Sequence, residues 1–60
     1  MRVYVNDRPL ELLPGMRVEH ALLKAGLLAA IQGGQKVYDE WGHEVGLDGA
    51  LTVDLKLYVR

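Results

Sequence analysis

The sequence predicts a single α+β domain over residues 1–60, in which a mixed sheet of four or five strands packs on one central helix. Three observations lead to this fold class. Apolar residues alternate with polar ones near both ends of the chain, which is typical of half-buried strands. Between these ends, one segment changes to the three- and four-residue spacing of an amphipathic helix. A single helix covers only one face of a sheet, so we expect the other face to lie open to solvent.

Residues 1–13 predict a β-hairpin. Val3 and Val5 fall on one side of a first strand, whereas Arg2 and Tyr4 fall on the other. Asn, Asp and Pro in residues 6–9 are typical of a turn. The alternation then resumes in residues 10–13, with two leucines on one side. Two strands joined by so short a turn form a hairpin.

The central helix is expected from about Arg17 to Gly26. Pro14 and Gly15 end the second strand, because proline removes a donor and glycine permits a positive φ. One apolar stripe then consists of Val18, Ala21, Leu22 and Ala25. Gly26 suits the left-handed residue after a helix, and the Leu that follows suits a Schellman ending.

Residues 27–31 are more apolar than a surface connection should be. Three arrangements explain them: the helix continues past Gly26, the segment packs beneath the sheet, or it forms an exposed adhesive patch. Residues 32–35 then predict a flexible loop.

The remaining residues predict three more strands. A short strand over residues 36–40 points Val37 inward, residues 41–43 form a turn, and residues 44–46 form a return strand. Residues 47–51 suggest one turn of tight helix. The last strand alternates most clearly, and its inward residues are expected to be Val53, Leu55, Leu57 and Val59. The predicted order is ββαβββ, with the first and last strands side by side.

Composition excludes several kinds of chemistry. The absence of Cys rules out disulfides, iron–sulfur ligation, thiolate zinc sites and a cysteine nucleophile. A net charge of −1 gives the whole chain no attraction to nucleic acid or acidic membranes. The N-terminus lacks a signal-peptide core, and the longest apolar run is too short to span a bilayer. We therefore expect a cytoplasmic protein that does not engage membranes.

The sequence predicts no catalytic, cofactor-binding or metal-binding residues. His20 and His43 are the only histidines, and zinc sites need three or four protein ligands. Thr52 is the only Ser or Thr and lacks the elbow motif of a nucleophile. The acids Asp39, Glu40 and Glu44 are best explained by a solvated turn.

The opening pattern V-x-V-N-D-x-x-x-x-L-x-P-G-x-x-V-x-x-A-L-x-x-A-G resembles the β-grasp (ubiquitin-like) superfamily. It is similar to the sulfur carriers of thiamine and molybdopterin synthesis, to plant-type [2Fe-2S] ferredoxin domains and to soluble-ligand-binding β-grasp modules. The resemblance implies a β-grasp fold across nearly the whole chain. The carriers act through a C-terminal Gly-Gly, but here Gly33-Gly34 is internal and the last strand is followed directly by the end. The four ferredoxin cysteines are missing from residues 27–31.

These departures favour a non-catalytic module that binds another protein or domain, or a second copy of itself, through its open sheet face. One alternative is a sulfur-carrier-like protein that is truncated or lacks its Gly-Gly tail. Another is a small-ligand-binding β-grasp module. Aromatic residues and Arg are enriched in protein interfaces. The residues predicted to bind a partner are Arg2, Tyr4, Trp41, Lys56, Tyr58 and Arg60. Nucleic acid is disfavoured as a partner, because the chain has no basic excess.

Overall fold

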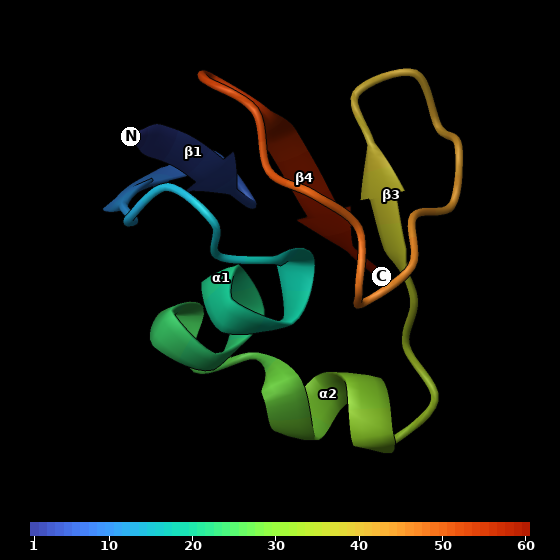
Figure 1. Cartoon of the computed structure of the whole chain (residues 1–60). Helices are drawn as coiled ribbons and strands as arrows, with labels where there is room; N and C mark the ends of the chain where they lie inside the picture. The colour runs from blue at the N-terminus through green and yellow to red at the C-terminus, as the bar shows by residue number, and fades with distance from the viewer.

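The computed structural model describes all 60 residues and contains four strands and two helices in the order ββααββ (Figure 1). The elements are β1 (Arg2–Val5), β2 (Arg8–Glu11), α1 (Val18–Ala25), α2 (Leu28–Gln32), β3 (Val37–Asp39) and β4 (Lys56–Val59). The chain is therefore α+β, as the sequence predicts, although its element order differs from the predicted one.

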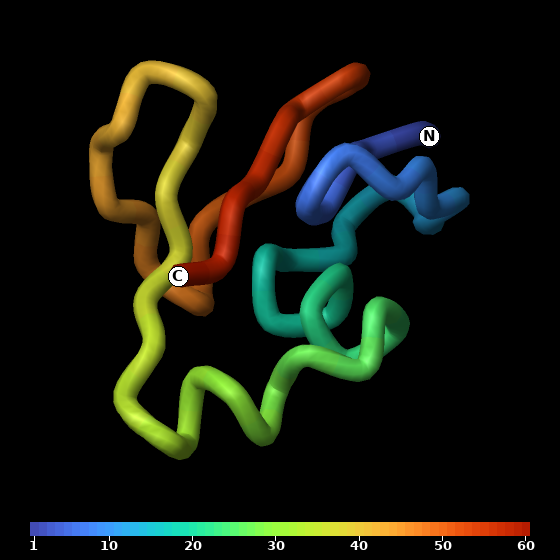
Figure 2. Tube along the Cα trace, turned by 180° about the vertical axis from the view of Figure 1, so that it is seen from behind, coloured from blue at the N-terminus to red at the C-terminus, as the bar shows by residue number.

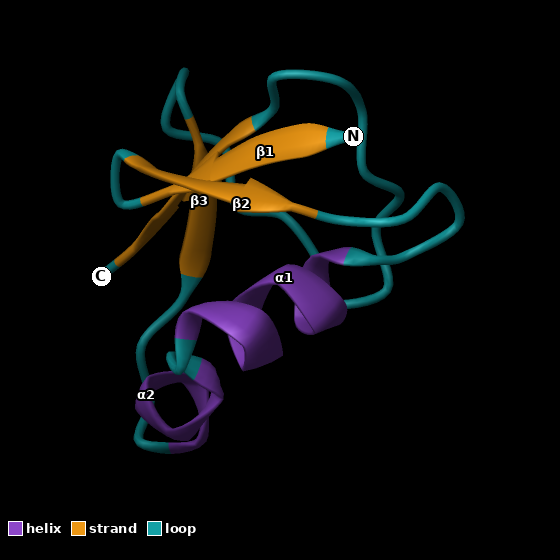
Figure 3. Cartoon of the chain, turned by 90° about the vertical axis from the view of Figure 1, so that its left-hand side faces the viewer, coloured by secondary structure: helices purple, strands orange, loops and turns teal.

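The four strands form one mixed sheet in the order β2-β1-β4-β3. β1 and β4 lie parallel at its centre, with Tyr4 opposite Lys56 and Val5 opposite Leu57. The two outer pairs, β1 with β2 and β3 with β4, are antiparallel. Figure 3 shows both helices on the same side of the sheet. Two predictions are confirmed: the first and last strands are adjacent, and the sheet is mixed.

The hydrophobic core lies between the sheet and α1. Its fully or nearly fully buried residues are Val3, Val5, Leu12, Val18, Ala21, Leu22, Val37 and Leu57. They come from alternate positions of the strands and from one stripe of the helix, which are the periods that the sequence shows. Leu10, Ala25 and other partly buried residues pack around this core.

Both ends of α1 have a local structural cause. At its start, the backbone N–H of Arg17 donates to Nδ1 of His20 at 2.8 Å, which is the backward half of a capping box. At its end, Gly26 has a φ of 76°. The Gly26 N–H donates to Leu23 and the Leu27 N–H donates to Leu22, at 3.1 and 2.9 Å. This pair of bonds confirms the expected Schellman ending.

The structure has two helices where the sequence predicts one: α1 is the predicted helix, and α2 follows it. The left-handed Gly26 stops α1, and α2 begins two residues later at Leu28 (Figure 2). Leu27, Leu28 and Ile31 are half-buried and pack against the core. None of the three arrangements expected for residues 27–31 is met in full, because the segment packs against the core as a separate helix after the break at Gly26. Neither helix of the structure could cross a membrane, as both are too short for it.

The segment between β3 and β4 is less regular than predicted. Residues 44–46 form no strand; Glu44 makes only an isolated bridge with Tyr38. Residues 47–51 form no helical turn, and a tight turn closes instead where the Gly49 N–H donates to the Gly46 carbonyl at 3.1 Å. The predicted fifth strand and the extra helical turn were wrong, because this segment pairs with β3 at only one bridge and then turns to bond with the start of α1.

The last strand is shorter than its apolar alternation predicts. Asp54 has a φ of 61°, so the chain turns at Val53 and Asp54 before β4 begins. Val53 is therefore 71% exposed, and its predicted inward position was wrong. Leu55, Leu57 and Val59 do face the core, as expected.

Candidate interaction surface

The sheet face opposite the helices collects five of the six residues that the sequence singles out. Val5 and Leu57, paired across the two central strands, are fully buried. Their neighbours must point the other way, because side chains alternate along a strand. The resulting open face carries Arg2, Tyr4, Lys56, Tyr58 and Arg60, together with Tyr38. The two strands that carry the five predicted residues are adjacent, as expected.

Tyr38 is the member of this face that sequence reasoning missed. It lies directly opposite Tyr58 in the β3–β4 pair. The Arg60 guanidinium carbon lies over the Tyr38 ring, 4.8 Å from its centroid, which is a cation–π contact. All three tyrosines of the chain therefore share one face. The sequence held a signal for this, because Val37 was expected inward and its neighbour consequently outward.

Arg2 is already paired within the domain. Its Nε donates to Oε1 of Glu11 on the neighbouring strand at 3.0 Å. This hydrogen bond lowers the pKa of Glu11 below its ordinary value and raises the pKa of the Arg2 guanidinium above its own. The charges of Arg2 and Glu11 therefore offset each other at the β2 end of the face.

Tyr58 is held against the first turn of the chain. Its hydroxyl donates to Oδ1 of Asp7 at 3.2 Å, and the adjacent Val59 N–H donates to Oδ1 of Asn6 at 2.9 Å. The pKa of Tyr58 lies above its ordinary value. Desolvation of the phenol is the largest cause, and the hydrogen bond to Asp7 is the second. The ring is therefore fixed in position and protonated, presenting an aromatic surface on a rigid strand.

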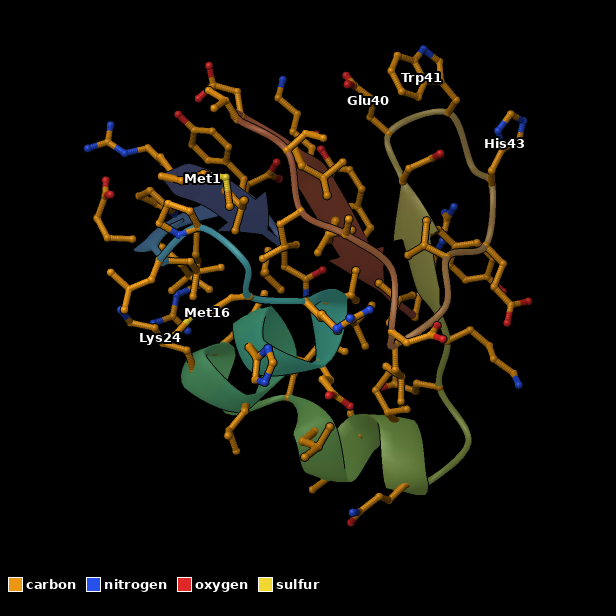
Figure 4. All side chains as sticks on the ribbon, in the orientation of Figure 1. Met1, Met16, Lys24, Glu40, Trp41 and His43 are labelled. Atoms are coloured by element: carbon orange, nitrogen blue, oxygen red, sulfur yellow. The ribbon has the colours of Figure 1, made fainter.

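Trp41 lies in the turn that follows β3 (Figure 4). Oδ1 of Asp39 accepts the backbone N–H of Trp41 at 3.0 Å and that of His43 at 2.9 Å, which fixes the turn. The Trp41 side chain is 73% exposed. It extends the candidate surface beyond the end of the sheet instead of lying within the open face.

The two histidines lie in different settings. Nδ1 of His20 accepts the N–H that opens α1, so this histidine has a structural task. His43 lies 3.8 Å from Asp39 in the exposed turn. No group of three or more His, Asp or Glu side chains in the structure is placed to hold a metal ion.

Both edges of the sheet are obstructed. On β2, Pro9 has no N–H to donate, and the Glu11 carbonyl accepts a hydrogen bond from Nζ of Lys24. On β3, the Val37 carbonyl accepts from the Val45 N–H and the Asp39 N–H donates to the His43 carbonyl, both at 2.9 Å. A partner strand would find few free backbone groups at either edge.

Comparison with protein-family models, with curated proteins and with solved structures finds no match to this chain.

Proposed function

We propose that the chain is a β-grasp-type domain that binds another protein through its open sheet face, without catalysis. Two features support the β-grasp assignment. The two central strands are parallel with an antiparallel strand at each edge, and both helices lie on one face of the sheet. The same arrangement leaves one sheet face uncovered, which is the surface that a partner can reach.

One observation carries the proposal: all three tyrosines lie on this face with Lys56 and Arg60 beside them. Tyr and Arg are enriched where proteins bind one another, because both can bury a large surface and donate hydrogen bonds. Here aromatic rings line the two strands at the centre of the sheet and the neighbouring edge strand.

The obstructed edges support docking on the face. Strand addition requires a row of free backbone donors and acceptors at a sheet edge. Pro9 and Lys24 remove such groups on β2, and the segment around Val45 covers β3. A partner that meets the domain therefore contacts side chains of the face.

Site-specific photocrosslinking in the source organism tests the proposal. A benzophenone amino acid replaces Tyr4 on the open face, and in a matched control it replaces Gln32, which is exposed on α2. We expect one or a few adducts of defined mass from position 4 and none from position 32. A second copy of the chain in the adduct identifies self-association. Equal labelling from both positions, or no adduct from position 4, contradicts the proposal.

A further inference from the structure

Two cations lie directly opposite each other at the β3 side of the open face. The Lys36 N–H donates to the Arg60 carbonyl at 2.9 Å, and the Arg60 N–H donates to the Lys36 carbonyl at 3.0 Å. Two such bonds define a hydrogen-bonded antiparallel pair, whose Cα atoms are about 5.5 Å apart. Their neighbours Val37 and Val59 face the core. Both cationic side chains therefore point to the open face.

Acids lie near this pair without pairing with it: Glu44 lines the same hollow as Lys36, and Glu40 lines the same hollow as Arg60. None of the four ion pairs in the structure involves Lys36 or Arg60. Glu44 is brought beside Tyr38 by an isolated bridge, yet it forms no ion pair with either cation. Like charges directly opposite in a sheet are destabilising. The chain has 8 acidic and 7 basic residues, so this arrangement does not follow from a shortage of acids.

Arg60 is also oriented for recognition. Its guanidinium lies over the Tyr38 ring at 4.8 Å, which limits its rotation. A stacked guanidinium keeps the N–H donors in its plane available, and that planar fork matches a carboxylate. Lys36 adds a mobile ammonium charge next to it. The three side chains are thus arranged so that they can meet an anion, and neither cation is held in an ion pair of the domain.

We propose that Lys36, Arg60 and Tyr38 bind an acidic segment, rich in Asp or Glu, of the protein that docks on the open face. This inference rests on the proposed function and specifies the chemistry of its partner. A carboxylate here would relieve the repulsion between the two cations. A peptide segment fits better than a nucleic acid. The Asp and Glu side chains of a protein can be confined to the part that meets Lys36 and Arg60, whereas a phosphate backbone carries a charge at every nucleotide and would also meet Asp7 and Glu11.

A peptide titration tests the inference. The probe is a short fluorescein-labelled peptide of alternating Glu and Ser, and fluorescence anisotropy reports its binding. We expect Lys36→Gln and Arg60→Gln each to weaken binding about two- to fivefold, as loss of an exposed charge pair does. Arg8→Gln is the matched control. Arg8 is an exposed cation on the opposite edge strand and makes no ion pair. Added salt should weaken binding to the wild type.

Thermal unfolding of the same variants gives a second readout. Lys36→Gln removes the opposed charge, so we expect it to unfold at a higher temperature than the wild type. Arg8→Gln has no such repulsion to relieve. If Lys36→Gln binds the acidic peptide less well and also unfolds at a higher temperature, the two opposed charges contribute to ligand binding at the expense of stability. A less stable Lys36→Gln variant contradicts the inference.

Three further results would overturn it. They are no binding of the acidic peptide at low salt, equal losses in Lys36→Gln and Arg8→Gln, and tighter binding of a single-stranded oligothymidine probe that the same variants abolish. Crosslinking from position 4 is measured separately. The acidic-segment inference can therefore fail while the open face stands as a protein-binding surface.

Discussion

The side-chain oxygen of Asn6 accepts a hydrogen bond from the backbone N–H of Val59 at 2.9 Å. The backbone N–H of Asn6 donates to the Leu57 carbonyl, also at 2.9 Å. Asn6 thus continues the β1–β4 ladder past the end of β1, using its side chain where its backbone turns away. Its φ of 50° is what turns the backbone. One residue therefore shapes the hairpin and joins it to β4.

Asn6→Gly should lower the free energy of unfolding by about 1 kcal/mol, the usual net value of one hydrogen bond. Glycine keeps the positive φ, so the loss reports the bond to Val59 and not backbone strain. Asn6→Asp, which retains the acceptor oxygen, is the control and should stay near the wild type. Urea unfolding followed by circular dichroism measures both. Equal losses in the two variants would count against this role for the side chain.

Tyr58 should make the stability fall at alkaline pH. Its raised pKa means that the folded state favours the protonated phenol. The contribution of the protonated phenol to the free energy of unfolding is fully present below the ordinary pKa of tyrosine, about 10. It is lost as the pH rises through the higher folded value. In a Tyr4→Phe/Tyr38→Phe background, ultraviolet absorbance follows the ionisation of Tyr58 alone. Asp7→Gly should move that midpoint to lower pH, and an unchanged midpoint would show that Asp7 has no influence.

His20→Ala should destabilise the domain by about 1 kcal/mol, because the Arg17 N–H at the start of α1 loses its acceptor. His20→Gln tests the cause, since glutamine at this position can accept the same bond. Chemical denaturation should rank the wild type and His20→Gln above His20→Ala. If both variants lose the same stability, the imidazole acts by some contact other than the cap.

Leu22→Ala should cost about 2–5 kcal/mol, as truncation of a fully buried leucine does. A core of this size supplies only about 3–5 kcal/mol in total, so the variant should be largely unfolded. Leu23, the next residue of α1, is 63% exposed and gives a matched control. Leu23→Ala should stay within about 0.5 kcal/mol of the wild type. Loss of dispersed amide signals in an NMR spectrum distinguishes the two outcomes.

The sequence predicted the elements whose local pattern and tertiary packing agree. Val3 and Val5 alternate because one sheet face is buried, and Gly26 ends α1 because only a left-handed residue fits there. The prediction from the sequence was wrong where a backbone turn interrupts an apolar alternation. Val53 matches the alternation of β4, but the positive φ of Asp54 breaks the strand before Val53 can point inward. Aspartate tolerates the left-handed region, but a single Asp within an apolar alternation also fits an outward strand position.

The open face was predicted in part. Tyr4, Lys56 and Tyr58 could be grouped because the first and last strands were expected to pair. The inward position expected for Val37 already implied an outward Tyr38, but its place beside Tyr58 depends on the sheet order and on the β3–β4 register. The opposed charges of Lys36 and Arg60 depend on the same register. Cross-strand contacts are tertiary facts, and alternation along one strand does not reveal them.

The parallel pairing of β1 with β4 also determines when the domain can fold. The residues joined by the Asn6–Val59 bond are 53 positions apart, so the centre of the sheet closes over almost the whole chain. Such long-range pairing costs loop-closure entropy and slows folding relative to local hairpins and helices. During synthesis, the β1–β2 hairpin and α1 can form early, but the inner edge of β1 stays unpaired until β4 has emerged. An unpaired strand edge promotes aggregation, so the nascent chain is most vulnerable just before its last strand is made.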